Sequence, residues 1–156
     1  MKSNAPSIVV GWREWVGLPD LCDVPIKAKI DTGARTSAIH AWNIRPVEVD
    51  GEKWVEFELH PIQDDNKTRR AARARVLEKR EVRSSTGHTQ VRYVVTTNIE
   101  LAGHVWPIEL TLTNRDEMGF RMLVGRTALR PHALVNPSSS FLCSPATRAK
   151  KRPSKD

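Results

Sequence analysis

Apolar and polar residues alternate along much of this chain with a period of two. The alternation is clearest in four segments, residues 24–31, 54–59, 91–101 and 106–112. A half-buried β-strand has this pattern because successive side chains point to opposite faces of the sheet. We therefore expect Ile26, Ala28 and Ile30 to share one buried face, and the odd-numbered side chains of residues 91–101 to share another.

Turn signals separate these segments at short intervals. Asp50-Gly51 is typical of a tight hairpin, and residues 102–104 provide a second turn. Residues 121–124 are expected to form a short buried strand, residues 126–129 one helical turn near the C-terminus, and residues 133–143 a final hairpin. Residues 63–75 mix charges with alanines, which favours an exposed loop and would also allow a short helix. Many short strands without a long amphipathic helix predict an all-β barrel or sandwich.

Length and charge indicate one domain with loose ends. The 156 residues suit a single domain at residues 8–143, after a flexible N-terminus at residues 1–7. Residues 144–156 are basic and lack large apolar side chains, so we expect a disordered tail. The net charge of +7 allows this tail to be a solvated end or a non-specific contact for anionic partners. No motif indicates a dedicated nucleic-acid-binding fold.

Targeting signals and cysteine use favour the cytoplasm. No apolar run is long enough for a membrane-spanning helix, and the apolar residues before Gly11 are too few for a secretory signal. Cys22 and Cys143 do not make a disulfide framework. We expect a cytoplasmic protein with reduced thiols and no membrane partner.

The strongest chemical signal is Asp31-Thr32-Gly33, which directly follows the apolar strand at residues 24–30. A strand that ends in this tripeptide delivers a carboxylate into a tight turn, where backbone groups can hold it for acid–base chemistry. The same tripeptide could form an Asx-type turn in which Asp31 only binds nearby backbone. A second signal lies far downstream, where an apolar run ends in Gly125-Arg126.

These two signals together resemble the retropepsin-like aspartic proteases of retroviral type. The sequences at residues 11–15, 27–38, 106–115 and 122–129 are similar to a bacterial family often labelled "ATP-dependent zinc protease" and grouped as retropepsin-like. The resemblance covers residues 8–143 and implies an acid-protease closed barrel with one lobe per chain. A two-lobed enzyme would need a second Asp-Thr/Ser-Gly, which the chain lacks. The resemblance therefore implies a homodimer that pairs one Asp31 from each subunit.

The resemblance also implies roles for the residues around the two signals. Asp31 would be the catalytic acid or base, with Thr32 and Gly33 shaping the site. Substrate would lie along the residues that follow, Ala34, Arg35 and Thr36. Gly125 and Arg126 of the closing loop would support the site.

Arg35 departs from the viral pattern, which has an aspartate at this position that pairs with the closing-loop arginine. Arg126 would then need another acidic partner, for which Glu109, Asp116 and Glu117 are candidates. We hypothesise that Arg35, with Lys27 or Lys29 nearby, favours acidic substrates; a surface or interface salt bridge is the competing interpretation.

Other catalytic classes have little support in the sequence. The five histidines do not form a His-Glu-x-x-His motif, and neither cysteine has finger spacing, so we expect no catalytic zinc. There is no phosphate-binding loop and no Gly-x-Ser-x-Gly motif. We expect no cofactor.

Two functions follow from these observations. The first is an aspartic endopeptidase, independent of metal, that acts on acidic proteins. The family's association with ATP-grasp glutamate ligases implies a link to glutamate tails on a ribosomal protein. The alternative is a noncatalytic module whose basic groove binds an acidic protein partner.

Overall fold

A computed structural model describes residues 8–62, 67–83, 87–113, 119–130 and 132–143. The expected flexible ends, residues 1–7 and 144–156, lie outside the described residues. Within the described residues, eleven strands and one short helix follow one another: β1 Ile8–Val10, β2 Arg13–Leu18, β3 Cys22–Asp31, β4 Ser37–His40, β5 Trp42–Val49, β6 Glu52–Leu59, β7 Arg70–Arg83, β8 Thr89–Leu101, β9 His104–Thr113, β10 Met122–Gly125, α1 Arg126–Leu129 and β11 Ala133–Val135.

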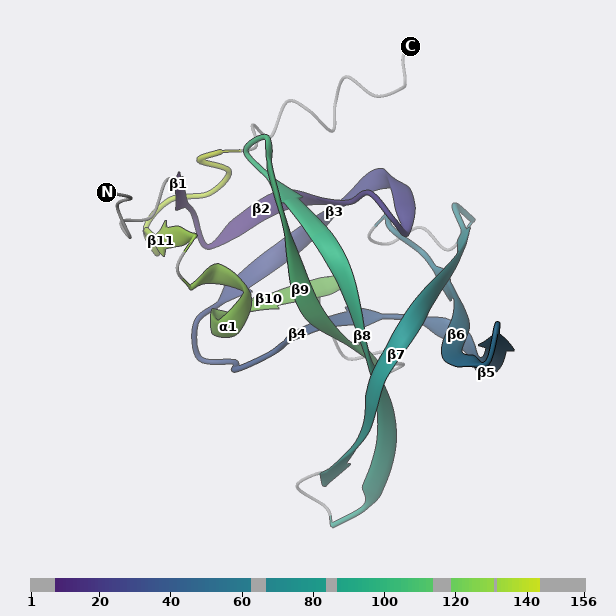
Figure 1. Ribbon diagram of the computed structural model, residues 1–156. Helices are drawn as coiled ribbons and strands as arrows, with labels where there is room; N and C mark the ends of the chain where they lie inside the picture. Colours follow the sequence, from purple (N-terminus) through teal and green to yellow (C-terminus); the bar gives the residue numbers. More distant parts are fainter. Residues whose placement is uncertain (1–7, 63–66, 84–86, 114–118, 131, 144–156) are drawn as a thin grey trace, which may run out of the picture.

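Six strands form a closed barrel in the order β2-β3-β10-β4-β9-β8 (Figure 1). The ring closes where β2 pairs with β8 at Gly17 and Glu100. The expected all-β closed barrel and the short helical turn near the C-terminus are therefore confirmed. Closure leaves no free edge on these strands, which satisfies their backbone groups internally.

β10 inserts between β3 and β4, although these two strands are neighbours in sequence. It runs parallel to β3, with Gly125 opposite Asp31, and antiparallel to β4, with Met122 opposite Ile39. The two sequence signals thus come together at the same end of the barrel. The loop at residues 32–36 passes around this end from β3 to β4.

The expected inward faces form the core. Ile26, Ala28 and Ile30 are buried, as are the alternating apolar residues of β6 and β9. In β8 the prediction holds only for residues 95–101, because the first half of the strand leaves the barrel. Val91, which was expected to face the core, is 58% exposed. The alternation predicted a strand here, but it did not show at which residue of the strand the barrel core ends.

Strands β7, β6 and β5 extend the sheet beyond the barrel (Figure 1). The prediction of an exposed loop or short helix at residues 63–75 is wrong from Arg70 onward, where β7 begins; residues 63–66 lie outside the described residues. Ala74 pairs opposite Val55 and is buried, while Ala72 is partly buried against the core. Because alanine side chains are small, their apolar signal in the sequence is weak. The arginines between them dominate the pattern and made the segment look like an exposed loop.

The expected final hairpin at residues 133–143 does not form, and other contacts join the two ends of the domain. β11 pairs in parallel with β1, placing Val9 opposite Leu134, and residues 141–143 are not a strand. Instead, the backbone N–H groups of Leu142 and Cys143 donate to the buried carboxylate of Glu14, at 2.8 and 3.3 Å. A buried side-chain acceptor therefore holds this segment in place of a strand ladder.

The helix content of the described residues is limited to α1. No helix in this part of the chain has the length and apolar character needed to cross a membrane.

Candidate active site

Asp31 is the last residue of β3 and is half-buried where the strand leaves the barrel. Its Oδ1 accepts a hydrogen bond from the backbone N–H of Gly33 at 3.0 Å, and its carbonyl accepts from the N–H of Ala34 at 3.1 Å. A Cβ at position 33 would lie 3.3 Å from the same Oδ1. Glycine therefore lets the turn fold tightly over the carboxylate, while Thr32 is exposed at its tip.

Gly125 supports this turn from inside the barrel. A Cβ on Gly125 would lie 2.6 Å from the carbonyl carbon of Thr36, so only glycine allows this close approach. The N–H of Gly125 donates to the Ser37 hydroxyl at 3.0 Å, in a buried contact. The N–H of Arg126 donates to the carbonyl of Ala34 at 2.9 Å. The closing loop is thereby fixed to both ends of the loop that follows Asp31.

The guanidinium of Arg126 binds backbone oxygens of the turn that carries Asp31. Its Nη1 lies 3.3 Å from the carbonyl oxygen of Thr32 and 3.2 Å from that of Gly33. Glu109 instead lies 3.9 Å from Arg80. The prediction of a Glu109 partner is therefore wrong, and residues 116 and 117 lie outside the described residues. Arg126 orients the carbonyls of the turn that carries Asp31.

Thr127 completes the support on the far side of the loop. Both its N–H and its hydroxyl donate to the carbonyl oxygen of Arg35, at 3.1 and 2.7 Å. The backbone of Arg35 is thus held at two points, while its side chain is exposed. A cationic side chain on a fixed backbone is a suitable element for reading the charge of a bound chain.

A hollow of about 750 Å³ is lined by Arg35 and Thr36 and by residues of β7, β8, β9 and α1. Its second cationic side chain is Arg80 of β7. Lys27 and Lys29, which we expected near Arg35, are not among the lining residues. The ammonium of Lys27 lies 5.8 Å from the Phe120 ring centroid. The cationic character of this hollow therefore comes from two arginines.

Ser37, Thr127 and Arg80 contribute to the site although they were not among its candidate residues. Ser37 and Thr127 lie in the stretches 27–38 and 122–129, but they act through backbone groups of distant segments, and Arg80 acts across the hollow. The basic composition of residues 67–83 is the sequence signal for a charged surface around Arg80.

The site can supply one carboxylate per chain, on a turn held by backbone hydrogen bonds. Within the described residues, no three histidine, cysteine, aspartate or glutamate side chains come close enough together to hold a metal ion. The chemistry that this geometry can serve is proton transfer to or from a group above the turn.

Known proteins similar to this chain include members of one named family. Residues 9–146 match the RimB-like family, described as retropepsin-like aspartic endopeptidase RimB. A protein of Shewanella halifaxensis named "Probable alpha-L-glutamate ligase" is 51% identical over 133 residues, 85% of this chain and 29% of that protein. A Desulfotalea psychrophila protein of the same name is 43% identical over 138 residues, 88% of this chain and 30% of that protein. The chain thus spans less than a third of the length of these curated relatives.

A solved structure shares the fold along most of the chain. Protein Lpg0085 of Legionella pneumophila, described as having unknown function, superposes with a TM-score of 0.72 at 29% identity. The match covers 91% of this chain and 100% of that one. Fold, motif geometry and the long family match agree, and the chain belongs to the RimB-like family of retropepsin-like aspartic endopeptidases.

Proposed function

We propose that this protein is an aspartic endopeptidase in which the Asp31 residues of two copies act together, without a metal. The observation that carries the proposal is the position of Asp31 at the end of a barrel strand. Its Oδ1 is held by the Gly33 N–H at 3.0 Å, and the turn is supported by Gly125 and Arg126. A fixed carboxylate on a rigid scaffold is the requirement for acid–base catalysis.

The reaction needs two carboxylates in different protonation states. Two aspartates a few ångströms apart do not both ionise easily, so they share one proton and titrate as a pair. The ionised member takes a proton from water as the water attacks the peptide carbonyl, and the protonated member donates to the carbonyl oxygen. The proton taken from water then passes to the leaving amine as the C–N bond breaks, a hydroxyl of the tetrahedral intermediate returns its proton to the aspartate pair, and no covalent bond to the enzyme forms.

A second copy of the chain would supply the missing carboxylate. Closed two-fold dimers are the commonest oligomers, and they place the same residue of both subunits at the axis. Asp31, Thr32 and Gly33 are accessible at the end of the barrel. Val9 and Leu134, paired in β1 and β11, are 48% and 58% exposed, and they offer an apolar surface for a contact between copies.

We infer acidic proteins as substrates, specifically chains that carry added glutamates, in the cytoplasm. The relatives named glutamate ligases contain a segment like this chain within a protein more than three times its matched length. This association supports hydrolysis of the tails that such ligases make, or action on the ligase system itself. The exposed Arg35 beside the hollow supports recognition of an anionic polypeptide.

A noncatalytic module that binds acidic proteins is the second candidate. The specific observation in its favour is that one chain presents one Asp-Thr-Gly turn beside a hollow lined by Arg35 and Arg80. A strictly monomeric protein would bind such partners and would not hydrolyse them by the paired mechanism.

The decisive experiment incubates purified protein with a glutamate-tailed ribosomal protein, with casein as a general substrate, and follows intact masses. Wild type, wild type with a chelator, and Asp31→Asn run in parallel, with sedimentation to measure the oligomeric state. Cleavage that survives the chelator and disappears in Asp31→Asn is expected. Cleavage that stops with the chelator but persists in Asp31→Asn would overturn the mechanism. Binding without cleavage by a monomer would favour the module.

A further inference from the structure

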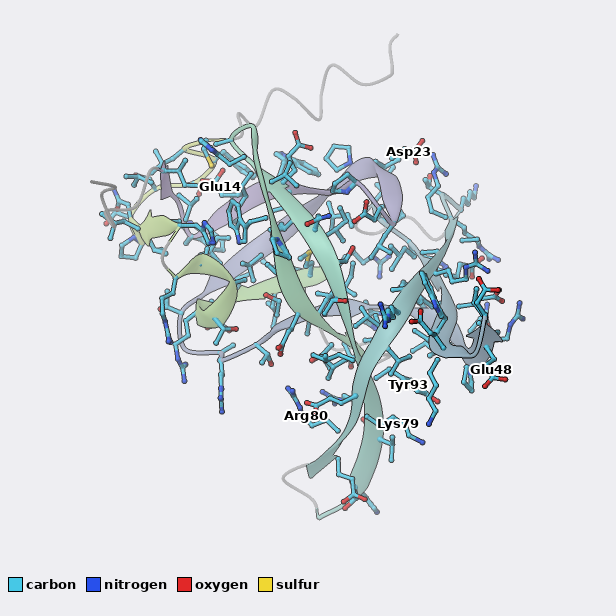
Figure 2. All side chains as sticks on the ribbon, viewed as in Figure 1. Glu14, Asp23, Glu48, Lys79, Arg80 and Tyr93 are labelled. Carbon is cyan, nitrogen blue, oxygen red and sulfur yellow. The ribbon has the colours of Figure 1, made fainter. Side chains whose placement is uncertain are left out.

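The hollow beside the Asp31 loop has a charged wall on the side of the β7–β8 hairpin. Arg80 and Thr96 line it from the hairpin, Glu109 from β9, Thr127 from α1, and Arg35 and Thr36 from the loop that follows Asp31. Figure 2 shows Arg80 on the opposite side of the hairpin from Lys79 and Tyr93. Arg80 and Arg35 therefore face one shared space from different segments of the chain.

Two carboxylates bind Arg80 in the structure. Its Nε donates to Glu78 Oε2 at 2.9 Å, a contact that Nη2 shares, and Nη2 lies 3.9 Å from Glu109 Oε1. The side chains of Glu78 and Glu109 are 46% and 50% exposed. Ion pairs with this much solvent access contribute little free energy. Another carboxylate can therefore replace either partner at small cost.

Two arginines lie opposite each other on the β7–β8 hairpin, an arrangement that is unfavourable in a hairpin without other charged groups nearby. Arg92 of β8 lies directly opposite Arg80 in the strand register, and like charges in this position are destabilising. Glu78 and Gln90 lie next to this pair and bind Arg80 and Arg92, respectively. Arg35 faces Arg80 from across the hollow, whose lining does not include Arg92. The local arrangement suits the binding of an anion.

We propose that Arg80 is a specificity-determining residue that binds the side-chain carboxylate of an acidic substrate residue, and that Glu109 occupies the site until substrate displaces it. A guanidinium presents paired donors that match a carboxylate, so it discriminates glutamate from glutamine. This proposal rests on the proposed function for the meaning of substrate. In the proposed two-fold dimer each subunit contributes one hollow. Acidic residues of the substrate would therefore be bound on both sides of the cleaved bond.

Glu109 has a specific role in this arrangement. Its carboxylate lies within ion-pair range of the guanidinium that would receive the substrate, and the two carboxylates compete for it. Removing the charge of Glu109 should therefore strengthen the binding of acidic chains, whereas removing the charge of Arg80 should weaken it. A residue that only stabilised the hairpin would not give these opposite effects.

The test measures binding without hydrolysis, in chains that also carry Asp31→Asn. Fluorescent peptides of ten glutamates or ten glutamines are titrated with Arg80→Gln, Glu109→Gln and Arg45→Gln chains, and anisotropy gives each Kd. Arg45 is the matched control, because it is an exposed arginine of β5 that forms an ion pair with Glu56 of β6, outside the barrel. Arg80→Gln should weaken oligoglutamate binding about tenfold or more, the effect of losing a hydrogen bond to a charged group. Glu109→Gln should tighten it about two- to fivefold.

The results expected of the controls are equally specific. Arg45→Gln should change the Kd for oligoglutamate less than twofold, and no variant should alter the binding of oligoglutamine. If Arg80→Gln matched Arg45→Gln, or if Glu109→Gln weakened binding, the proposal would be overturned. Circular dichroism checks the fold, and if Arg80→Gln does not fold, Arg80→Lys replaces it. Lysine keeps the charge without the paired donors, so wild-type discrimination by Arg80→Lys would also overturn the proposal.

The proposal and the peptidase function can fail separately. Loss of glutamate binding in Arg80→Gln, in a protein that hydrolyses nothing, would support Arg80 as the anion-binding residue and reject the peptidase. Hydrolysis that needs Asp31 but ignores Arg80 would support the peptidase and reject the role of Arg80.

Discussion

The hydroxyl oxygen of Ser37 accepts a hydrogen bond at 3.0 Å from the backbone N–H of Gly125, which lies 88 residues further along the chain. Ser37 is 1% exposed, so water cannot readily replace this contact. It joins β4 to the closing loop behind the turn that carries Asp31. The position of the candidate catalytic carboxylate thus depends on a buried serine outside the Asp-Thr-Gly motif.

Ser37→Ala should lower the free energy of unfolding by about 1–3 kcal/mol, because it leaves the buried Gly125 N–H without this acceptor. Urea unfolding followed by tryptophan fluorescence measures the change. Ser138→Ala is the matched control, since Ser138 is exposed and should tolerate the change. A loss below about 0.5 kcal/mol in Ser37→Ala, the range of ordinary surface substitutions, would show that another group satisfies the N–H.

Arg126→Lys tests how firmly the turn that carries Asp31 must be held for the proposed hydrolysis. Lysine keeps the positive charge, but it lacks the guanidinium that binds the carbonyls of Thr32 and Gly33. We expect kcat for peptide hydrolysis to fall about tenfold or more, since small misplacements of a catalytic group are costly. Substrate KM should change little.

The control for this prediction is Arg130→Lys, an exposed arginine at the end of α1. Stability measured by thermal unfolding should be similar in both variants. Unchanged kcat in Arg126→Lys would mean that Gly125 and Ser37 hold the turn without the guanidinium.

Glu14→Gln should release the C-terminal segment of the domain. The Glu14 carboxylate accepts hydrogen bonds from the N–H groups of Gly11, Leu142 and Cys143, at 2.6, 2.8 and 3.3 Å. An amide substitutes a donor for one of its oxygens, so at least one N–H loses its partner. We expect a loss of about 1.5–3 kcal/mol in the free energy of unfolding, the range for hydrogen bonds to charged groups.

Limited proteolysis monitors the same variant locally. Cleavage near residues 139–143 should accelerate in Glu14→Gln and not in Glu48→Gln, which changes an exposed glutamate. Equal cleavage rates in the two variants would contradict the idea that Glu14 holds this segment.

The thiol of Cys143 should resist alkylation in the folded protein. Burial raises its pKa to about 12, and the neighbouring Glu14 charge adds to the rise. About one thiol in ten thousand is then ionised at pH 8, and the thiolate is the reactive form. Iodoacetamide labelling read by intact mass should modify Cys143 slowly in native protein and rapidly in urea. Equal rates would contradict the raised pKa.

The same pKa shift gives a direction for stability at alkaline pH. The folded state holds the proton more tightly than the unfolded state, whose thiol ionises near pH 9. The contribution of Cys143 is therefore complete below pH 9 and is lost as the pH rises from 9 toward 12. Cys143→Ser removes this titration, so its stability should decline less steeply over that range.

The barrel was predictable where apolar side chains alternate against a continuous core. Residues 26–30 and the return strand β9 show a plain period of two, and the structure buries the expected faces. The first part of β7 was missed because alanines supply its buried face. Residues 141–143 were assigned to a strand because they are apolar, but their backbone binds Glu14 from the other end of the domain. Such a long-range acceptor leaves no local pattern.

The candidate site was predictable to the extent that short motifs define it. Asp31 and Gly125 stand in recognisable tripeptides, and the strand register brings them together. Arg126 was recognisable from the Gly-Arg motif. The groups that it binds were not predictable, because backbone carbonyls have no sequence signature. Arg80 lies in a basic segment whose orientation depends on the twist of the hairpin, and the register with β8 decides which face each side chain takes.

The insertion of β10 between β3 and β4 also sets an order of events during synthesis on the ribosome. The Asp-Thr-Gly turn emerges early, but the strand that supports it is made some ninety residues later. Until residues 122–125 leave the exit tunnel, β3 and β4 lack their shared neighbour, and the carboxylate has no rigid base. A nascent chain therefore cannot present the Asp31 turn in its supported form until most of the domain has been made.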